Sequence, residues 1–173
     1  MVYRFRQFFC ALTARVGDGE EWALAELLTP PQRAVFRRMA PNDQRHSLNV
    51  CVTLRQAGYE DPALLKAALL HDAGKAAGRI WLWQRTLIVL FRRWAPRLLR
   101  WLERGASCEE APWWRIGFVI NRLHPELGAS WAAQAGCSST TVALIRRHQE
   151  PVQVIKSEQD RLLAALQWAD GVN

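Results

Sequence analysis

The sequence predicts an all-helical bundle of about seven to ten helices. Strand signals are nearly absent: no stretch alternates apolar and polar residues for long, and no Asn-Gly or Asp-Gly pair joins two such stretches into a hairpin. Prolines and glycines instead separate segments whose apolar residues follow a helical period. The chain of 173 residues is the size of one domain, so we expect a single core that needs no disulfides.

The composition is that of an ordinary soluble protein, with 50% hydrophobic and 23% charged residues. The four cysteines contain no C-x-x-C pair, which excludes a zinc-finger pattern and a readable disulfide framework. We therefore expect reduced thiols and a cytoplasmic location. No segment approaches the roughly 20 apolar residues that a membrane-spanning helix requires.

Four helices are expected in the first third of the chain. The first has apolar residues on one face, and its basic start followed by a short apolar stretch also fits a signal peptide, which is the less favoured alternative. Prolines precede the third and fourth helices, and Gly58 closes the fourth. The expected segments are 3–15, 20–28, 32–39 and 43–58.

The middle of the chain is expected to hold three more helices. Asp61 caps a helix that has Pro62 in its first turn and ends on the His-Asp pair at 71–72. Two basic, tryptophan-rich helices follow, divided by Pro96 because proline disrupts a helix interior. A loop is expected over 105–112.

The C-terminal part is expected to be helical as well. The segment 113–123 is either a helix or an extended approach to His124. A helix then starts near Pro125 and ends at Gly136. Two helices complete the chain: 140–150, opened by Ser138 or Ser139 and stopped by Pro151, and 158–170, opened by a capping box of Ser157 and Asp160 and ended by Gly171.

The histidines carry the chemistry of this sequence. A lone histidine is most simply a core or capping residue. A set of imidazoles with carboxylates is, however, the ligand type of divalent metal ions, and bundles build metal sites from residues on facing helices. Neighbouring His71 and Asp72 point about 100° apart on a helix. Both reach one ion only if the last turn relaxes, and Gly74 supplies that freedom.

The segments "RHSLNV", "LLHDAGK", "HPELGA", "RRHQE" and "QWAD" resemble, in order and spacing, the HD-domain metal-dependent phosphohydrolase superfamily, particularly its binuclear HD-x-G-K members. The likeness spans residues 42–170. It implies one HD-domain-like helical bundle over 1–173. Within it, we expect an N-terminal helical extension, a metal-site core in two parts and a basic tryptophan-rich insert, which cover 1–41, 42–78 with 119–170, and 79–118 respectively.

The resemblance also implies a ligand set. One metal is held by His46, His71, Asp72 and Asp170, and Asp72 bridges to a second metal held by His124 and His148. Many binuclear relatives have a His-His pair where this chain has His148 and Gln149, and glutamine is a poor replacement ligand. We therefore expect one or two divalent ions, drawn from Mn, Fe, Mg, Zn, Co and Ni.

The activity that the resemblance implies is hydrolysis of a small phosphate ester or phosphodiester, broadly a nucleotide, by a metal-activated water. Asp72 and Lys75 are the expected catalytic residues, and Lys75 and Arg45 are expected to bind phosphate. Lys75 also suits a helix C-terminus without any catalytic role. Two alternatives remain, a di-iron oxygenase and a non-catalytic binding or signalling module; the presence of every expected ligand argues against the module.

The segment 79–104 contains seven arginines and one acidic residue, Glu103, in a chain of net charge +7. Six of the nine tryptophans lie between 81 and 114. If one helix ran through Pro96, six of the arginines would share about 140° of its circumference. Three interpretations remain: a solvent face over a core stripe, peripheral contact with an anionic membrane, and a cover that attracts an anionic substrate to the active site. Nucleic acid is not expected as a partner, because no recognised nucleic-acid motif is present.

Overall fold

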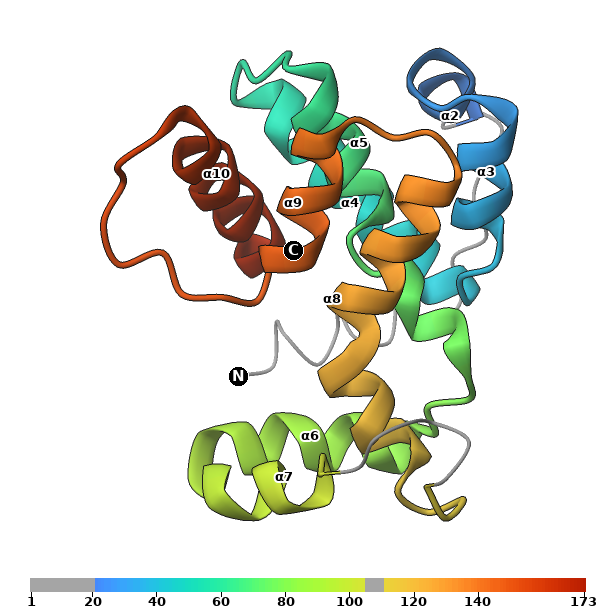
Figure 1. Cartoon of the computed structure of the whole chain (residues 1–173), viewed down its shortest axis with the longest axis vertical. Coiled ribbons are helices and arrows are strands. Elements are labelled where there is room, and N and C mark those ends of the chain that lie inside the picture. The colour runs from blue at the N-terminus through green and yellow to red at the C-terminus, as the bar shows by residue number, and fades with distance from the viewer. Residues whose placement is uncertain (1–20, 105–110) are drawn as a thin grey trace.

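The computed structural model describes residues 21–104 and 111–173, and within these ranges every regular element is a helix (Figure 1). The prediction of an all-helical bundle of seven to ten helices is confirmed for this part of the chain. The predicted helix over 3–15 and the first six residues of the predicted loop lie outside it. The elements are α2 (Glu21–Leu27), α3 (Pro30–Arg37), α4 (Pro41–Gln56), α5 (Pro62–Leu70), the 3-10 helix η1 (Ala73–Ala77), α6 (Leu82–Trp94), α7 (Pro96–Leu102), α8 (Ile116–Gln134), α9 (Ser139–Arg147) and α10 (Glu158–Val172).

Helix α5 forms the centre of the core. It packs against α2, α3, α4, α9 and α10, and its apolar residues between Leu64 and Leu70 are almost all buried. Asp61 begins the helix as predicted, because its carboxylate accepts a hydrogen bond from the Leu64 amide at 2.9 Å. The helix ends at His71, so the central element of the core delivers the His-Asp pair at its C-terminal end.

Helices α6 and α7 lie side by side across the N-terminal end of α8, at the bottom of Figure 1. They form a small second core, in which Ile88, Leu99 and Leu102 pack with Phe118 of α8. Ala95 ends α6 and precedes α7, with φ −138° and ψ 57° outside the helical region. The predicted division at Pro96 is therefore confirmed. The arginines of α6 and α7 belong to two helices and do not share the circumference of one.

Helix α8 confirms the helical alternative for 113–123 from Ile116 on, but it differs from the prediction at Pro125. It runs without interruption through Pro125, so neither an extended approach to His124 nor a helix start near Pro125 is present. A proline inside a helix leaves the carbonyl four residues earlier without its amide partner. Here that carbonyl belongs to Asn121. It accepts a hydrogen bond from Nδ1 of the His124 ring at 2.8 Å instead. The helix continues because this bond and burial offset the missing one.

Gly74 lies where η1 crosses α8. A Cβ atom at this position would stand 2.0 Å from the His124 carbonyl oxygen and 2.7 Å from the Gly128 amide nitrogen. The left-handed glycines among the described residues are Gly58 and Gly136, so Gly74 is required for close backbone approach rather than for unusual dihedral angles. This approach holds the His-Asp pair against the helix that carries His124.

No helix within the described ranges combines the length and the apolar character needed to cross a bilayer.

Replacing Gly74 with alanine should destabilise the fold by about 3 kcal/mol, because the atoms that a methyl group would meet belong to the backbone and cannot rotate away. Urea unfolding followed by circular dichroism measures the change. Gly171→Ala in α10 is the matched control, since no atom lies within 4 Å of its added Cβ. Equal stability of the two variants would contradict the close approach of η1 and α8.

Candidate metal centre

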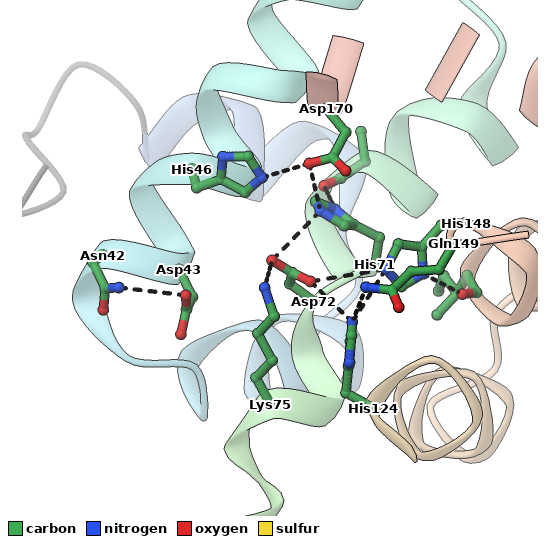
Figure 2. Close-up of polar contacts among 12 residues, drawn as sticks. Asn42, Asp43, His46, His71, Asp72, Lys75, His124, His148, Gln149 and Asp170 are labelled. Atoms are coloured by element: carbon green, nitrogen blue, oxygen red, sulfur yellow. Dashed lines mark hydrogen bonds and ion pairs between the residues drawn. The ribbon is translucent and has the colours of Figure 1, made fainter. Parts of the chain in front are cut away.

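The structure brings all the sequence-predicted ligand residues to one place. They converge from the ends or the interiors of separate helices, and their polar atoms point toward one another (Figure 2). Two groups, each with ligand atoms within 4.8 Å of one another, are able to hold a metal ion. The groups are His46, His71 and Asp170, and Asp72, His124 and His148.

Two of the histidines follow directly after a helix and turn back onto its last carbonyls. His71 Nδ1 donates to the Ala68 carbonyl at 2.9 Å, and His148 Nδ1 donates to the Ile145 carbonyl at 2.7 Å. Both acceptors belong to the last turn, whose carbonyls have no partner within the helix. A carbonyl can only accept, so Nδ1 carries the proton and Nε2 of each neutral ring presents a lone pair.

His124 has the same orientation inside a helix. Its Nδ1 donates to the Asn121 carbonyl, which Pro125 leaves free. All three imidazoles therefore have a fixed tautomer, with Nε2 directed into the site. This is the arrangement that orients metal-binding histidines, in which the second ring nitrogen donates to a carbonyl or carboxylate.

The second group has the spacing of a metal site. His124 Nε2 lies 3.4 Å from Asp72 Oδ1 and 3.2 Å from His148 Nε2, and His148 Nε2 lies 3.9 Å from the same carboxylate oxygen. Ligand atoms bound at about 2.1 Å to a tetrahedral ion are about 3.4 Å apart. Two imidazole lone pairs that face each other repel unless a cation or a proton lies between them. The donor set therefore fits a divalent ion.

The first group contains an unpartnered buried nitrogen. His71 Nε2 is buried without a hydrogen-bond partner, 3.6 Å from Asp170 Oδ1. His46 Nε2 donates to the same Asp170 oxygen at 2.7 Å, so this proton must leave before His46 can bind a metal. A buried polar atom without a partner is costly unless a ligand satisfies it.

Asp72 joins the two groups. Its Oδ1 faces His124 and His148, and its Oδ2 lies 3.6 Å from His71 Nε2. Lys75 Nζ lies 2.5 Å from Oδ2, so the ammonium group neutralises this carboxylate in the structure described. The carboxylate thus has one oxygen toward each group, so it would be able to contact an ion in either of them.

The site is strongly polarised. Burial alone would raise the pKa of Asp72, but Lys75 and His71 outweigh it and hold this pKa well below its usual range. Burial would lower the pKa of His71, but Asp72 and Asp170 outweigh it, and this pKa is raised. Burial, reinforced by nearby His71, lowers the pKa of His148 to about 3. His148 is therefore neutral, as a metal ligand must be.

A cavity of about 270 Å³ lies over the two groups, and α6 forms its opposite wall. Lys75, Arg85 and Arg92 line this cavity together with the carboxylates of Asp72 and Asp170. Ile88 and Val89 add apolar surface. A neighbouring cavity of about 450 Å³ shares Arg92 with it and extends toward α7. The described residues thus include a groove beside the two His/Asp groups whose α6 wall carries two guanidinium groups, a feature suited to an anionic ligand.

Two arginines of this wall were not predicted as site residues. Arg85 is fixed by a two-pronged pair with Asp43, with both N–O distances 2.8 Å. Arg92 is exposed and has no ion-pair partner among the described residues. The only sequence signal for either was the cluster of arginines in 79–104, of which an active-site cover was one interpretation. Arg45, which was expected to bind phosphate, does not line either of these cavities.

Gln149 follows His148, at the position where many of the binuclear proteins that this chain resembles have a second histidine. Its Nε2 is 3.3 Å from His124 Nε2, so its amide donates to the lone pair that would otherwise face a metal. The side chain is exposed and lines both cavities. Gln149 thus lies at the solvent-exposed side of the second group, with its amide on His124.

Comparisons with protein-family models, with curated proteins and with solved structures give no match to this chain. The resemblance to the HD-domain superfamily therefore stays a prediction. What the structure defines, over residues 21–104 and 111–173, is an all-helical fold with two adjoining groups of histidine and aspartate that are able to hold metal.

Replacing Pro125 with alanine should weaken metal binding by about tenfold or more while leaving the helix intact. The new amide would compete with His124 Nδ1 for the Asn121 carbonyl and loosen the ring. Isothermal titration with Zn²⁺ or Mn²⁺ measures the affinity. Pro62→Ala, at the first residue of α5, is the control, because Pro62 lies at the opposite end of the helix from His71. Unchanged affinity in Pro125→Ala would show that this carbonyl does not orient His124.

Metal affinity should also depend on pH. The pKa of His71 is raised, so as the pH falls below that value His71 becomes protonated and a metal must displace the proton. The apparent dissociation constant should then rise by about tenfold for each further pH unit. Titrations between about pH 8 and about pH 5 measure this slope, and an affinity that is flat across the range would exclude His71 as a ligand.

Proposed function

We propose that this protein is a metal-dependent phosphohydrolase that cleaves a small phosphate ester or phosphodiester. The observation that carries the proposal is the meeting of two His/Asp groups with a cationic wall in one cavity. Divalent ions bound at such a site lower the pKa of water and polarise phosphate oxygens. A nucleotide is the broad substrate class that the family resemblance suggests.

Positive charge at the cavity favours a phosphate substrate. Arg92 is exposed and unpaired within the described residues, so its guanidinium is available for two-pronged binding of phosphate oxygens. Arg85 is held by Asp43 and adds a fixed charge at the rim. An oxygenase acting on a neutral substrate would have no need for these groups, so the lining favours the hydrolase over the di-iron alternative.

Lys75 is the residue best placed to move between partners. Its Nζ contacts Asp72 and the residue also lines the cavity, so a side-chain rotation would bring the ammonium group toward a phosphate bound there. Asp72 is buried and its pKa is held well below its usual range, so it remains a carboxylate at neutral pH. Together these two side chains supply opposite charges at the point where the groove meets the two metal groups.

The size of the cavity favours a small reacting group. A volume of about 270 Å³ lies near the lower end of ligand pockets, and the neighbouring cavity of about 450 Å³ gives space for the rest of a larger substrate. His71 and His124 are almost completely buried and line neither cavity, whereas Asp72, His148 and Asp170 line the smaller one. A substrate in this cavity would therefore meet the two groups through these three side chains.

The proposal is tested with metal-loaded protein and chromogenic phosphate monoesters and diesters, followed by a panel of nucleotides. Asp72→Asn should lower kcat by at least about a hundredfold, because it removes the charge that joins the two groups. Lys75→Gln should mainly raise KM, and Lys66→Gln on α5 is the matched control of a lysine outside the cavity. Oxygen consumption by the Fe²⁺-loaded protein without any phosphatase activity would refute the hydrolase.

A further inference from the structure

The α6–α7 pair carries apolar side chains that the structure leaves in solvent. Trp94 is 73% exposed, Val89 is 68% exposed and Trp101 is 51% exposed. Leu98 adds a further exposed aliphatic group. Large exposed apolar side chains that gather on two adjacent helices indicate an interaction surface rather than ordinary scatter.

The same helices carry exposed arginines. Arg93, Arg97 and Arg100 are exposed, and none has an ion-pair partner among residues 21–104 and 111–173. We call the two sets together the arginine–tryptophan surface; its members are Val89, Arg93, Trp94, Arg97, Leu98, Arg100 and Trp101.

The backbone under this surface is fixed. The inner side of the pair packs on Phe118 of α8. Arg115 donates to the Trp101 and Leu102 carbonyls at 3.1 Å and so satisfies the end of α7. Its guanidinium also lies 5.5 Å from the Trp101 ring centroid. The exposed side chains therefore extend from helices whose backbone is held in place by packing and by hydrogen bonds.

We propose that the arginine–tryptophan surface docks on the face of an anionic lipid membrane. Arginine, tryptophan and aliphatic side chains together suit the lipid interface, where guanidinium groups meet lipid phosphates and the rings and aliphatic groups enter the headgroup region. A nucleic acid would satisfy the arginines but offer no apolar partner for Val89 and Leu98. A second copy of this chain would bring like charges together at the same surface.

Docking would also place the metal centre at the membrane. Val89 belongs to the surface and lines the cavity, and Arg92 lies in the same stretch of α6 and lines both cavities. The rim of the groove would then face the headgroups. The docking itself does not depend on the hydrolase activity proposed above, so either one can fail alone.

The test is co-sedimentation of the full chain with vesicles of phosphatidylcholine, alone or mixed in equal parts with phosphatidylglycerol. We expect binding only to the mixed vesicles, and Arg97→Glu with Arg100→Glu should reduce it at least about tenfold. Trp94→Ala with Trp101→Ala should also weaken it. The control pair, Arg33→Glu with Arg37→Glu on α3, makes the same charge change elsewhere and should bind as the wild type does.

Brominated phosphatidylcholine in the mixed vesicles gives a second readout. Tryptophan fluorescence should be quenched, and the quenching should decrease in Trp94→Ala with Trp101→Ala. The proposal is overturned by absence of binding to the mixed vesicles, by an equal loss in the α3 pair, or by quenching that the tryptophan pair leaves unchanged. Dimers that the tryptophan pair dissociates, or preference for duplex DNA over vesicles, would also overturn it in favour of those partners.

Discussion

The candidate site depends on backbone carbonyls that the helices leave without partners. Ala68 and Ile145 occupy the same place in the last turns of α5 and α9, and each accepts a hydrogen bond from the histidine that follows. Pro125 likewise leaves the Asn121 carbonyl within α8 without an amide partner, and His124 Nδ1 donates to it. Since a carbonyl cannot donate, these bonds fix the tautomers and direct three nitrogen lone pairs inward. Such a set of buried lone pairs is unfavourable without a cation, which links the helix ends to the chemistry of the centre.

Electrostatics then join this centre to the basic helices. Asp72 and Asp170 concentrate negative charge at the site. Burial would raise the pKa of both carboxyl groups, but Lys75 and the neighbouring histidines outweigh it and hold both pKa values below their usual range. The Arg85–Asp43 pair connects α6 to α4, the helix that carries His46. The segment between the two parts of the metal-site core is therefore attached to that core and brings its positive charge to the cavity. Its outer surface, by contrast, remains exposed.

Local signals predicted much of the fold. Asp61 and Ser138 accept hydrogen bonds from amides of the first helical turn, as their sequence positions indicate, and Pro96 separates α6 from α7. The helix start predicted near Pro125 is wrong. Proline usually interrupts a helix, whereas here the His124 hydrogen bond and burial against η1 keep α8 continuous.

The residues of the two His/Asp groups were predictable, because their types and spacing are visible along the chain. Arg85 and Arg92 were not, since their place beside the site depends on how α6 folds back, which an ion pair between residues 42 positions apart helps to fix. Gly74 was singled out correctly but for conformational freedom, whereas it serves close packing.

The most direct test of the centre is X-ray absorption of protein loaded with Zn²⁺ or Mn²⁺. We predict nitrogen and oxygen ligands at about 2.0–2.2 Å with outer-shell scattering from several imidazoles. A spectrum without imidazole scattering, or protein that retains no metal, would contradict the account.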